Sequence, residues 1–235
     1  MSETDASATA PIVVSDTLPA DAPILFDGPP LDLPPGAVQN EDGSVTLTLQ
    51  YPFDLQFRTV GSEQVARTER FETLLLRRLT GADVRKLLSA RNLEGTALAA
   101  SSGLGAAKLS LMQQRMDAAD EGAARDIVNE LLGNLTPGLP PHADETADGI
   151  DLPLFRPAID EAGTVWTRLS FGRLTAAQRR QATDAANLLD WAVGFATGLK
   201  PAIAKTLVDA MDGADAMAAS RVVLFLCGSG RRTGR

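Results

Sequence analysis

Apolar and polar residues alternate in two stretches of the chain, each followed or interrupted by proline. Residues 45–51 (Val-Thr-Leu-Thr-Leu-Gln-Tyr) and 150–156 (Ile-Asp-Leu-Pro-Leu-Phe-Arg) have the period of two that is typical of half-buried β-strands. Pro52 and Pro157 are predicted to end these strands, because proline cannot donate to a ladder.

A second strand is predicted in each region, at 71–76 and at 165–171. The connection to it spans about 53–70 in the first region, whereas residues 160–163 (Asp-Glu-Ala-Gly) predict a tight turn in the second. Each region is therefore predicted to begin with a β-hairpin.

A helical period follows each hairpin directly. Thr80 and Thr175 have the chemistry of N-caps, with Asp83 or Gln178 three residues later as in a capping box. The helices are predicted to start at the next residue and to continue, with a break near Asn92 or Asn187, to a glycine that favours a left-handed end. A short helix comes next.

The last helix of each region has the clearest pattern. Asp117 and Asp212 are predicted to cap it, and apolar residues recur at helical spacing until Gly133 and Gly228 stop it. Each region is thus predicted to contain a hairpin followed by about three α-helices, which is an α+β fold.

The two regions are also similar in sequence. When residues 166–228 are laid over 71–133 without a gap, about 22 of 63 positions are identical, where chance would give roughly 5. The shared segments include Arg78-Leu79-Thr80 against Arg173-Leu174-Thr175, and Met116-Asp117 against Met211-Asp212. Such self-similarity indicates a tandem repeat of one folding unit.

Composition sets the limits of the two repeats. We predict a disordered, acidic, Pro-rich tail at 1–43, repeat 1 at 44–133, a Pro-rich linker at 134–148, repeat 2 at 149–228 and a flexible basic tail at 229–235. The length of 235 residues suits two domains of this size.

Charge and cysteine content narrow the classes of partner. A net charge of −8 and a pI near 4.7 argue against a nucleic-acid surface, and no segment has the length and apolarity of a membrane span. The single cysteine, Cys227, cannot form an internal disulfide, which favours a reducing cytoplasm. It falls on the apolar face of the last helix, where a core role is expected.

The sequence offers no catalytic constellation. The single histidine, His142, lies in the linker, which argues against a His-dependent triad or a multi-histidine metal site. The pairs Asp117/Asp120 and Asp212/Asp215 are interpreted as caps and first-turn carboxylates favoured by the helix dipole. We therefore expect no enzyme activity, catalytic residue, metal or cofactor.

The strand-to-helix junction carries a family resemblance. A strand, a proline and a second strand ending in Leu76-Arg-Arg-Leu-Thr-x-x-Asp83, followed by helices and an Asp-led last helix, resembles the tail assembly chaperones of Mu-like and related contractile-tailed phages. Repeat 2 keeps Arg173-Leu174-Thr175 but has Gly172 and Gln178 at two motif positions. The resemblance covers about 45–133 and 149–228, and a tandem copy departs from the usual single-domain member.

The resemblance implies a non-catalytic role in phage or prophage virion assembly. Such proteins bind the helical tape-measure protein in the cytoplasm of the bacterial host, promote polymerisation of the tail tube protein around it, and are absent from the mature virion. Two alternatives stay open: a structural tail or connector component of the virion, and a small acidic regulator that binds a host protein. No nucleic acid or membrane is expected as a partner.

Differences between the repeats indicate where a partner binds. Repeat 2 gains apolar side chains where repeat 1 is small or polar, and these residues are Trp191, Phe195, Val208, Leu224 and Phe225. One interpretation is a groove or patch for a partner helix or for self-association. The other is packing against repeat 1, or a fuller core within repeat 2.

Overall fold

A computed structural model describes residues 31–58, 66–134 and 138–228. In this part of the chain the fold is α+β, with two three-stranded antiparallel sheets and eight helices. We refer to residues 31–134 as the N-terminal half and to residues 138–228 as the C-terminal half. The predictions of a tail at 1–30 and at 229–235 lie outside the described residues.

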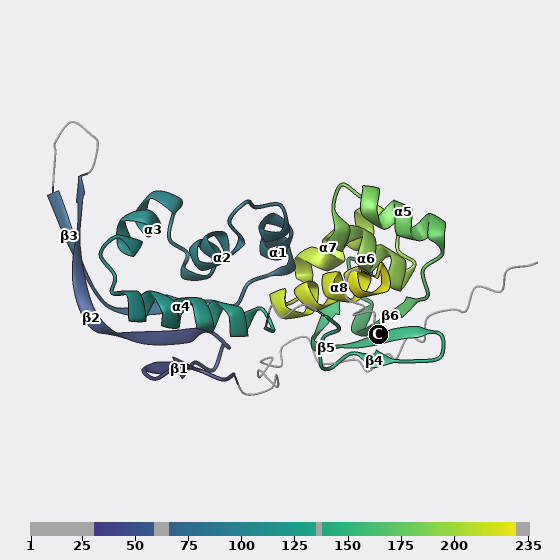
Figure 1. The fold of residues 1–235 in the computed structure, drawn as a ribbon, viewed down its shortest axis with the longest axis horizontal. Coiled ribbons are helices and arrows are strands. Elements are labelled where there is room, and N and C mark those ends of the chain that lie inside the picture. The colour runs from purple at the N-terminus through teal and green to yellow at the C-terminus, as the bar shows by residue number, and fades with distance from the viewer. Residues whose placement is uncertain (1–30, 59–65, 135–137, 229–235) are drawn as a thin grey trace, which may run out of the picture.

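The two halves have the same order of elements (Figure 1). The N-terminal half contains β1 (Ala37–Gln39), β2 (Val45–Arg58), β3 (Ala66–Leu76), α1 (Gly81–Leu88), α2 (Leu93–Ser102), α3 (Ala106–Gln113) and α4 (Ala118–Leu131). The C-terminal half contains β4 (Asp144–Glu145), β5 (Gly149–Ile159), β6 (Val165–Gly172), α5 (Ala176–Asp184), α6 (Leu188–Thr197), α7 (Pro201–Ala210) and α8 (Gly213–Leu226).

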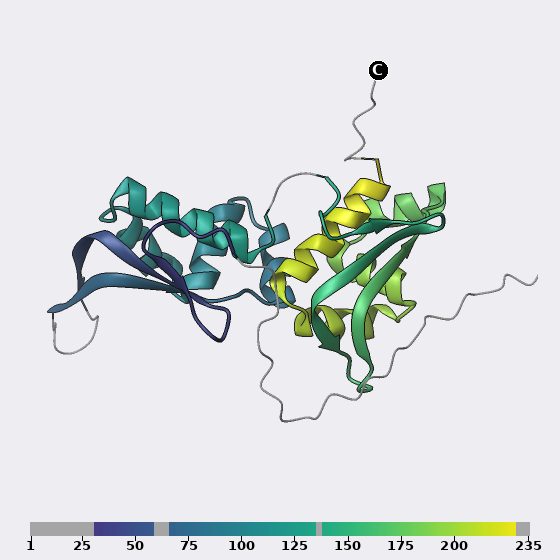
Figure 2. The same ribbon diagram turned by 90° about the horizontal axis from the view of Figure 1, so that it is seen from below.

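Each sheet buries one face beneath helices. Val45, Leu47 and Leu49 are buried and alternate with half-buried or exposed residues along β2, as the period of two predicted. The last helix of each half packs on its hairpin: α4 contacts β2 and β3, and α8 contacts β5 and β6. The two sheets lie on the same side of the molecule (Figure 2).

The first strands are longer than predicted. Both β2 and β5 continue past Pro52 and Pro157, because each proline lies in a register shift where the strand bulges away from its partner. A missing N–H costs no ladder bond there. The connection predicted at 53–70 is accordingly wrong, since β2 reaches Arg58 and β3 starts at Ala66.

The other differences from the predicted elements are a short edge strand and a fourth helix in each half. Within the predicted tail, Ala37–Gln39 forms β1 on the edge of the first sheet, and within the predicted linker, Asp144–Glu145 forms β4 beside β5. The breaks predicted near Asn92 and Asn187 are confirmed, since each residue is the N-cap of a separate helix, and each half therefore has four helices where about three were predicted.

Candidate functional site

The predicted caps lie at helix N-termini. Thr80 and Thr175 form capping boxes at α1 and α5, each accepting a backbone N–H bond from the third helical residue. The carboxylates of Asp117 and Asp212 accept the N–H groups of Ala119 and Ala214 at α4 and α8. These four residues fix where the helices start.

A groove of about 660 Å³ opens between α5, α6 and α7. Its lining is mostly apolar, with polar residues from each helix at intervals. The residues are Gln178, Gln181, Ala185, Ala186, Asn187, Asp190, Trp191, Gly194, Phe195, Leu199, Pro201, Ala202 and Lys205. This is a volume in the range of clefts that bind ligands or partner side chains.

Two predicted partner residues meet in this groove. Trp191 and Phe195 lie one turn apart on α6, and their rings stack with centroids 5.1 Å apart and planes within 5°. Both side chains are half-buried, so each presents part of its ring surface to the groove. In the N-terminal half the corresponding residues are Thr96 and Ala100.

The other three predicted partner residues lie elsewhere. Leu224 on α8 is 43% exposed, while its neighbour Phe225 is half-buried and packs against the core. The prediction that Val208 belongs to a partner surface is wrong. Its side chain is fully buried, because α7 packs against the first turn of α1 at Gly81. The structure therefore brings only Trp191 and Phe195 together.

A close contact joins the two halves where α1 meets α7 and α8 (Figure 1). Arg78 makes a bidentate pair with Asp212, with Nε 2.7 Å from Oδ2 and Nη2 2.8 Å from Oδ1. Both side chains are nearly buried, at 10% and 4% exposure, so this ion pair is shielded from water.

Backbone groups also pair across this contact. The N–H of Gly81 donates to the carbonyl of Met211 at 2.9 Å, and the N–H of Gly213 donates to the carbonyl of Leu79 at 2.7 Å. Neither glycine has room for a methyl group: a Cβ on Gly213 would lie 2.6 Å from the Leu79 oxygen, and one on Gly81 would overlap the Val208 carbonyl. Glycine is thus required on both sides.

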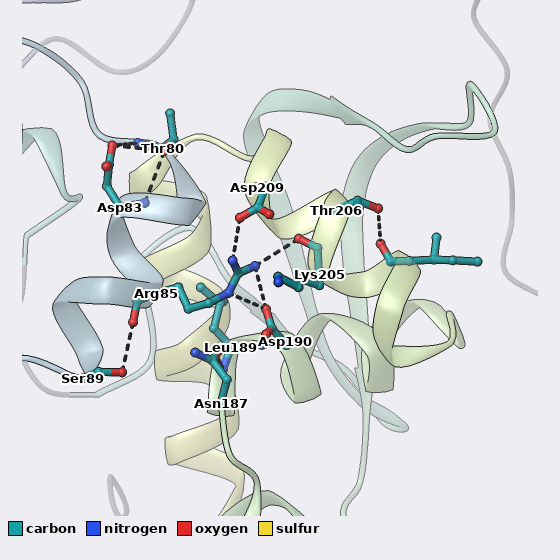
Figure 3. Close-up of polar contacts among 11 residues, drawn as sticks. Thr80, Asp83, Arg85, Ser89, Asn187, Leu189, Asp190, Lys205, Thr206 and Asp209 are labelled. Atoms are coloured by element: carbon teal, nitrogen blue, oxygen red, sulfur yellow. Dashed lines mark hydrogen bonds and ion pairs between the residues drawn. The ribbon is translucent and has the colours of Figure 1, made fainter.

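Arg85 adds a second polar cluster beside the groove (Figure 3). Its guanidinium donates to Asp190 at 2.9 Å, to Asp209 at 2.6 Å and to the carbonyl of Lys205 at 3.0 Å. Asp190 and Lys205 also line the groove, so the contact between the halves and the groove share a wall.

Buried carboxylates hold both hairpin bulges. Asp120 accepts the N–H groups of Gln50 and Tyr51 at 2.9 and 3.1 Å, and Asp215 accepts those of two bulge residues of β5, at 2.8 and 3.1 Å. These residues were interpreted as first-turn carboxylates favoured by the dipole, and the structure adds this specific role. They tie α4 to β2 and α8 to β5, the first strand of each hairpin.

Asp215 has an unusual protonation equilibrium. Burial raises its pKa to about 7, and the nearby Asp212 also raises it, while the two backbone N–H donors act in the opposite direction. The geometry has two donors on two oxygens and suits the ionised form, so the burial cost is what moves the equilibrium.

Other chemistry is sparse in the described ranges. No group of three or more His, Cys, Asp or Glu side chains there could hold a metal ion. Helices within the same ranges are too short or too polar to cross a membrane. His142 packs against Phe155 with ring centroids 4.2 Å apart, and burial lowers the pKa of the histidine. Cys227 ends α8 and is half-buried.

Sequence reasoning allowed packing between the halves but did not identify the residues that make the contact. Its signals were differences between the repeats: Gly81 and Gly213 stand where the other copy has alanine, and Asp190 and Asp209 stand where it has Gly95 and Gln114. These differences do not predict the contact from sequence alone, because their role can be assigned only when the packing of α1 against α7 and α8 is known.

Comparison with known proteins adds no relative to this picture. The chain matches no protein-family model, no curated protein and no solved structure.

Proposed function

We propose that this chain is a non-catalytic binding protein, formed by tandem duplication of a hairpin-and-helices unit, and that its α5–α7 groove holds a helical segment of another polypeptide. The stacked pair of Trp191 and Phe195 in that groove is the observation that carries the proposal. The partner that best fits the resemblance of the Leu76–Asp83 junction is a phage tape-measure protein, which makes the chain a tail assembly chaperone of the host cytoplasm.

The shape of the groove favours a helix as the occupant. Its α6 wall is a stripe of residues at successive turns, namely Asn187, Trp191 and Phe195 with Gly194 between them. A row of side chains at this spacing accepts the ridge of a second helix. Burial of a Trp or Phe ring contributes roughly 1.5–3 kcal/mol each from area.

Polar residues around the groove favour an amphipathic partner over a fully apolar one. Asp190 and Lys205 bring opposite charges to one wall, and Gln178 and Gln181 line the other. A partner helix with an apolar stripe flanked by polar residues would satisfy both parts. Tape-measure proteins are long and rich in helices, so they offer many such segments and need protection before the tube encloses them.

Duplication is supported by more than sequence. The two halves share element order, capping boxes at Thr80 and Thr175, and the carboxylates of Asp120 and Asp215 that hold a bulge in each hairpin. An assembly role in which one unit binds a partner and the other supports it agrees with the groove in the C-terminal half, where Trp191 and Phe195 stand in place of Thr96 and Ala100.

Co-expression tests the proposal. The chain is produced together with the large coiled-coil protein encoded next to it, which the proposal identifies as a tape-measure protein, and we expect that protein to become soluble and to co-purify. If it stays insoluble alone and with the chain, the chaperone assignment is wrong. Mass spectrometry of purified particles is the second readout: the chain should be missing, and stoichiometric presence would favour a structural tail component.

A further inference from the structure

The contact between the halves is heterologous, since it joins two different surfaces. The first is the α1 face, made by Arg78, Thr80, Gly81 and Arg85; the second is the α7–α8 junction. The gap-free match of residues 166–228 to residues 71–133 gives each half an equivalent of both surfaces. A heterologous contact that does not close on itself generates open, growing assemblies.

Among the described residues, two of these four surfaces have no other part of the chain docked on them. The α5 face of the C-terminal half exposes Arg173, Thr175 and Arg180, which correspond to Arg78, Thr80 and Arg85. On the N-terminal half, the α3–α4 junction exposes Asp117, which corresponds to Asp212. For the pair of Arg173 and Asp117, therefore, the α5 face of one copy matches the α3–α4 junction of the next in charge.

Steric fit at the same surfaces is different. Ala176 stands where the α1 face has Gly81, and Ala118 stands where the α7–α8 junction has Gly213. A Cβ at either glycine would meet backbone atoms of the opposite surface, at 2.6 Å for Gly213 and closer for Gly81. Backbone cannot yield as a flexible side chain can, so the two alanines are incompatible with the observed docking geometry.

The acidic partners of the arginine are also missing. Asp190 and Asp209, which receive Arg85, correspond to Gly95 and Gln114 in the N-terminal half. If Arg180 docked on that surface, its guanidinium would lose its contact with water and gain neither carboxylate. The cost of this unpaired charge disfavours docking of a second copy.

We infer that Ala118 and Ala176 restrict this docking mode to the two halves of one chain, and that they prevent a second copy from adding head to tail through Arg173 and Asp117. The selectivity rests on a glycine at both ends of the contact, together with the Asp190 and Asp209 carboxylates. This inference concerns self-recognition and does not depend on what occupies the α5–α7 groove.

The inference is tested by giving the two open surfaces the residues that stand at the native contact. A full-length variant carrying Gly95→Asp, Gln114→Asp, Ala118→Gly and Ala176→Gly is compared with the parent by sedimentation velocity over a range of concentrations. We expect the weight-average mass of the variant to rise with concentration to about twice that of the parent or more. Adding Arg173→Ala should reverse the rise. A folded variant whose masses equal those of the parent overturns the inference.

The opposite substitution gives an independent test on the native contact. Gly81→Ala in the full chain should separate the halves and increase the radius of gyration in small-angle scattering, with circular dichroism reporting that the helices remain. Ala176→Gly is its matched control and should leave the scattering curve unchanged. If Gly81→Ala leaves both the scattering curve and the unfolding midpoint as in the parent, alanine fits the contact and the steric basis is wrong.

Discussion

The two halves of the molecule agree in what holds each together and differ in what each presents outward. Asp120 and Asp215 hold the same bulge, and Thr80 and Thr175 form the same capping box. In contrast, Arg78 is nearly buried in an ion pair, whereas the corresponding Arg173 is exposed. The comparison teaches that the two halves share the contacts that hold each hairpin to its helices, while they differ in the side chains that they leave exposed.

The groove follows the same rule. Trp191 and Phe195 occupy positions where the N-terminal half has Thr96 and Ala100. These large side chains are not needed to complete the unit, because the N-terminal half forms its four helices without them. Their place in the groove gives the C-terminal half an aromatic surface between α5, α6 and α7, which Thr96 and Ala100 cannot form at the corresponding positions.

The largest expected effect on stability comes from replacing Arg78, and the corresponding Arg173 serves as its comparison. Arg78→Ala leaves the Asp212 carboxylate nearly buried without its cation and should lower the free energy of unfolding by about 3–5 kcal/mol. Arg173→Ala, at the corresponding exposed position, should change it by less than about 0.5 kcal/mol. Urea unfolding of both variants measures these changes in the free energy of unfolding. Equal changes would contradict the claim that Arg78 lies in a buried contact and Arg173 on an open surface.

Asp215 gives a pH dependence of intermediate size. Its folded pKa of about 7 lies above the ordinary value, so its stabilising contribution is complete below pH 4 and is lost as pH rises through 7. From this group, the free energy of unfolding should fall by on the order of 2 kcal/mol between pH 5.5 and 8.

Asp215→Asn isolates that dependence. The amide cannot lose a proton, and it can accept only one of the two bulge N–H bonds, so the variant is less stable throughout but lacks this slope. Unfolding curves at several pH values give the difference between parent and variant. Parallel pH profiles would mean that Asp215 is ionised over the whole range.

The smallest effect concerns α8. Exchanging Leu224 and Phe225 for the Asn and Glu of the N-terminal half should lower the free energy of unfolding by about 1–2 kcal/mol, mostly through the half-buried Phe225 ring. Thermal and urea unfolding report the change. A loss of several kcal/mol would place both residues in the core and remove them from any partner surface.

Local chemistry made part of this fold predictable from sequence. Thr80 and Thr175 were recognisable as caps because a capping box involves neighbours only, and Gly103 and Gly198 end α2 and α6 in the left-handed conformation that their position suggested. The prediction that Pro52 ends the first strand was wrong. The bulge that accommodates this proline is held by Asp120, which is distant in sequence.

The candidate sites were predictable only in part for the same reason. Trp191 and Phe195 were found because large side chains replace small ones, and a one-turn spacing on a helix places them together. Val208 carried the same signal but is buried by α1 of the other half, and the Arg78–Asp212 pair joins residues 134 positions apart. Such tertiary contacts leave no local pattern.

Binding by the groove is the central claim, and one pull-down tests it most directly. Trp191→Thr with Phe195→Ala gives the groove the side chains of the N-terminal half, and Arg173→Ala is the surface control. Co-expressed with the tape-measure protein, the parent and the control should retain it in the soluble, co-purifying fraction, and the double variant should lose most of it while remaining folded. Equal recovery by all three proteins would contradict a role for the groove.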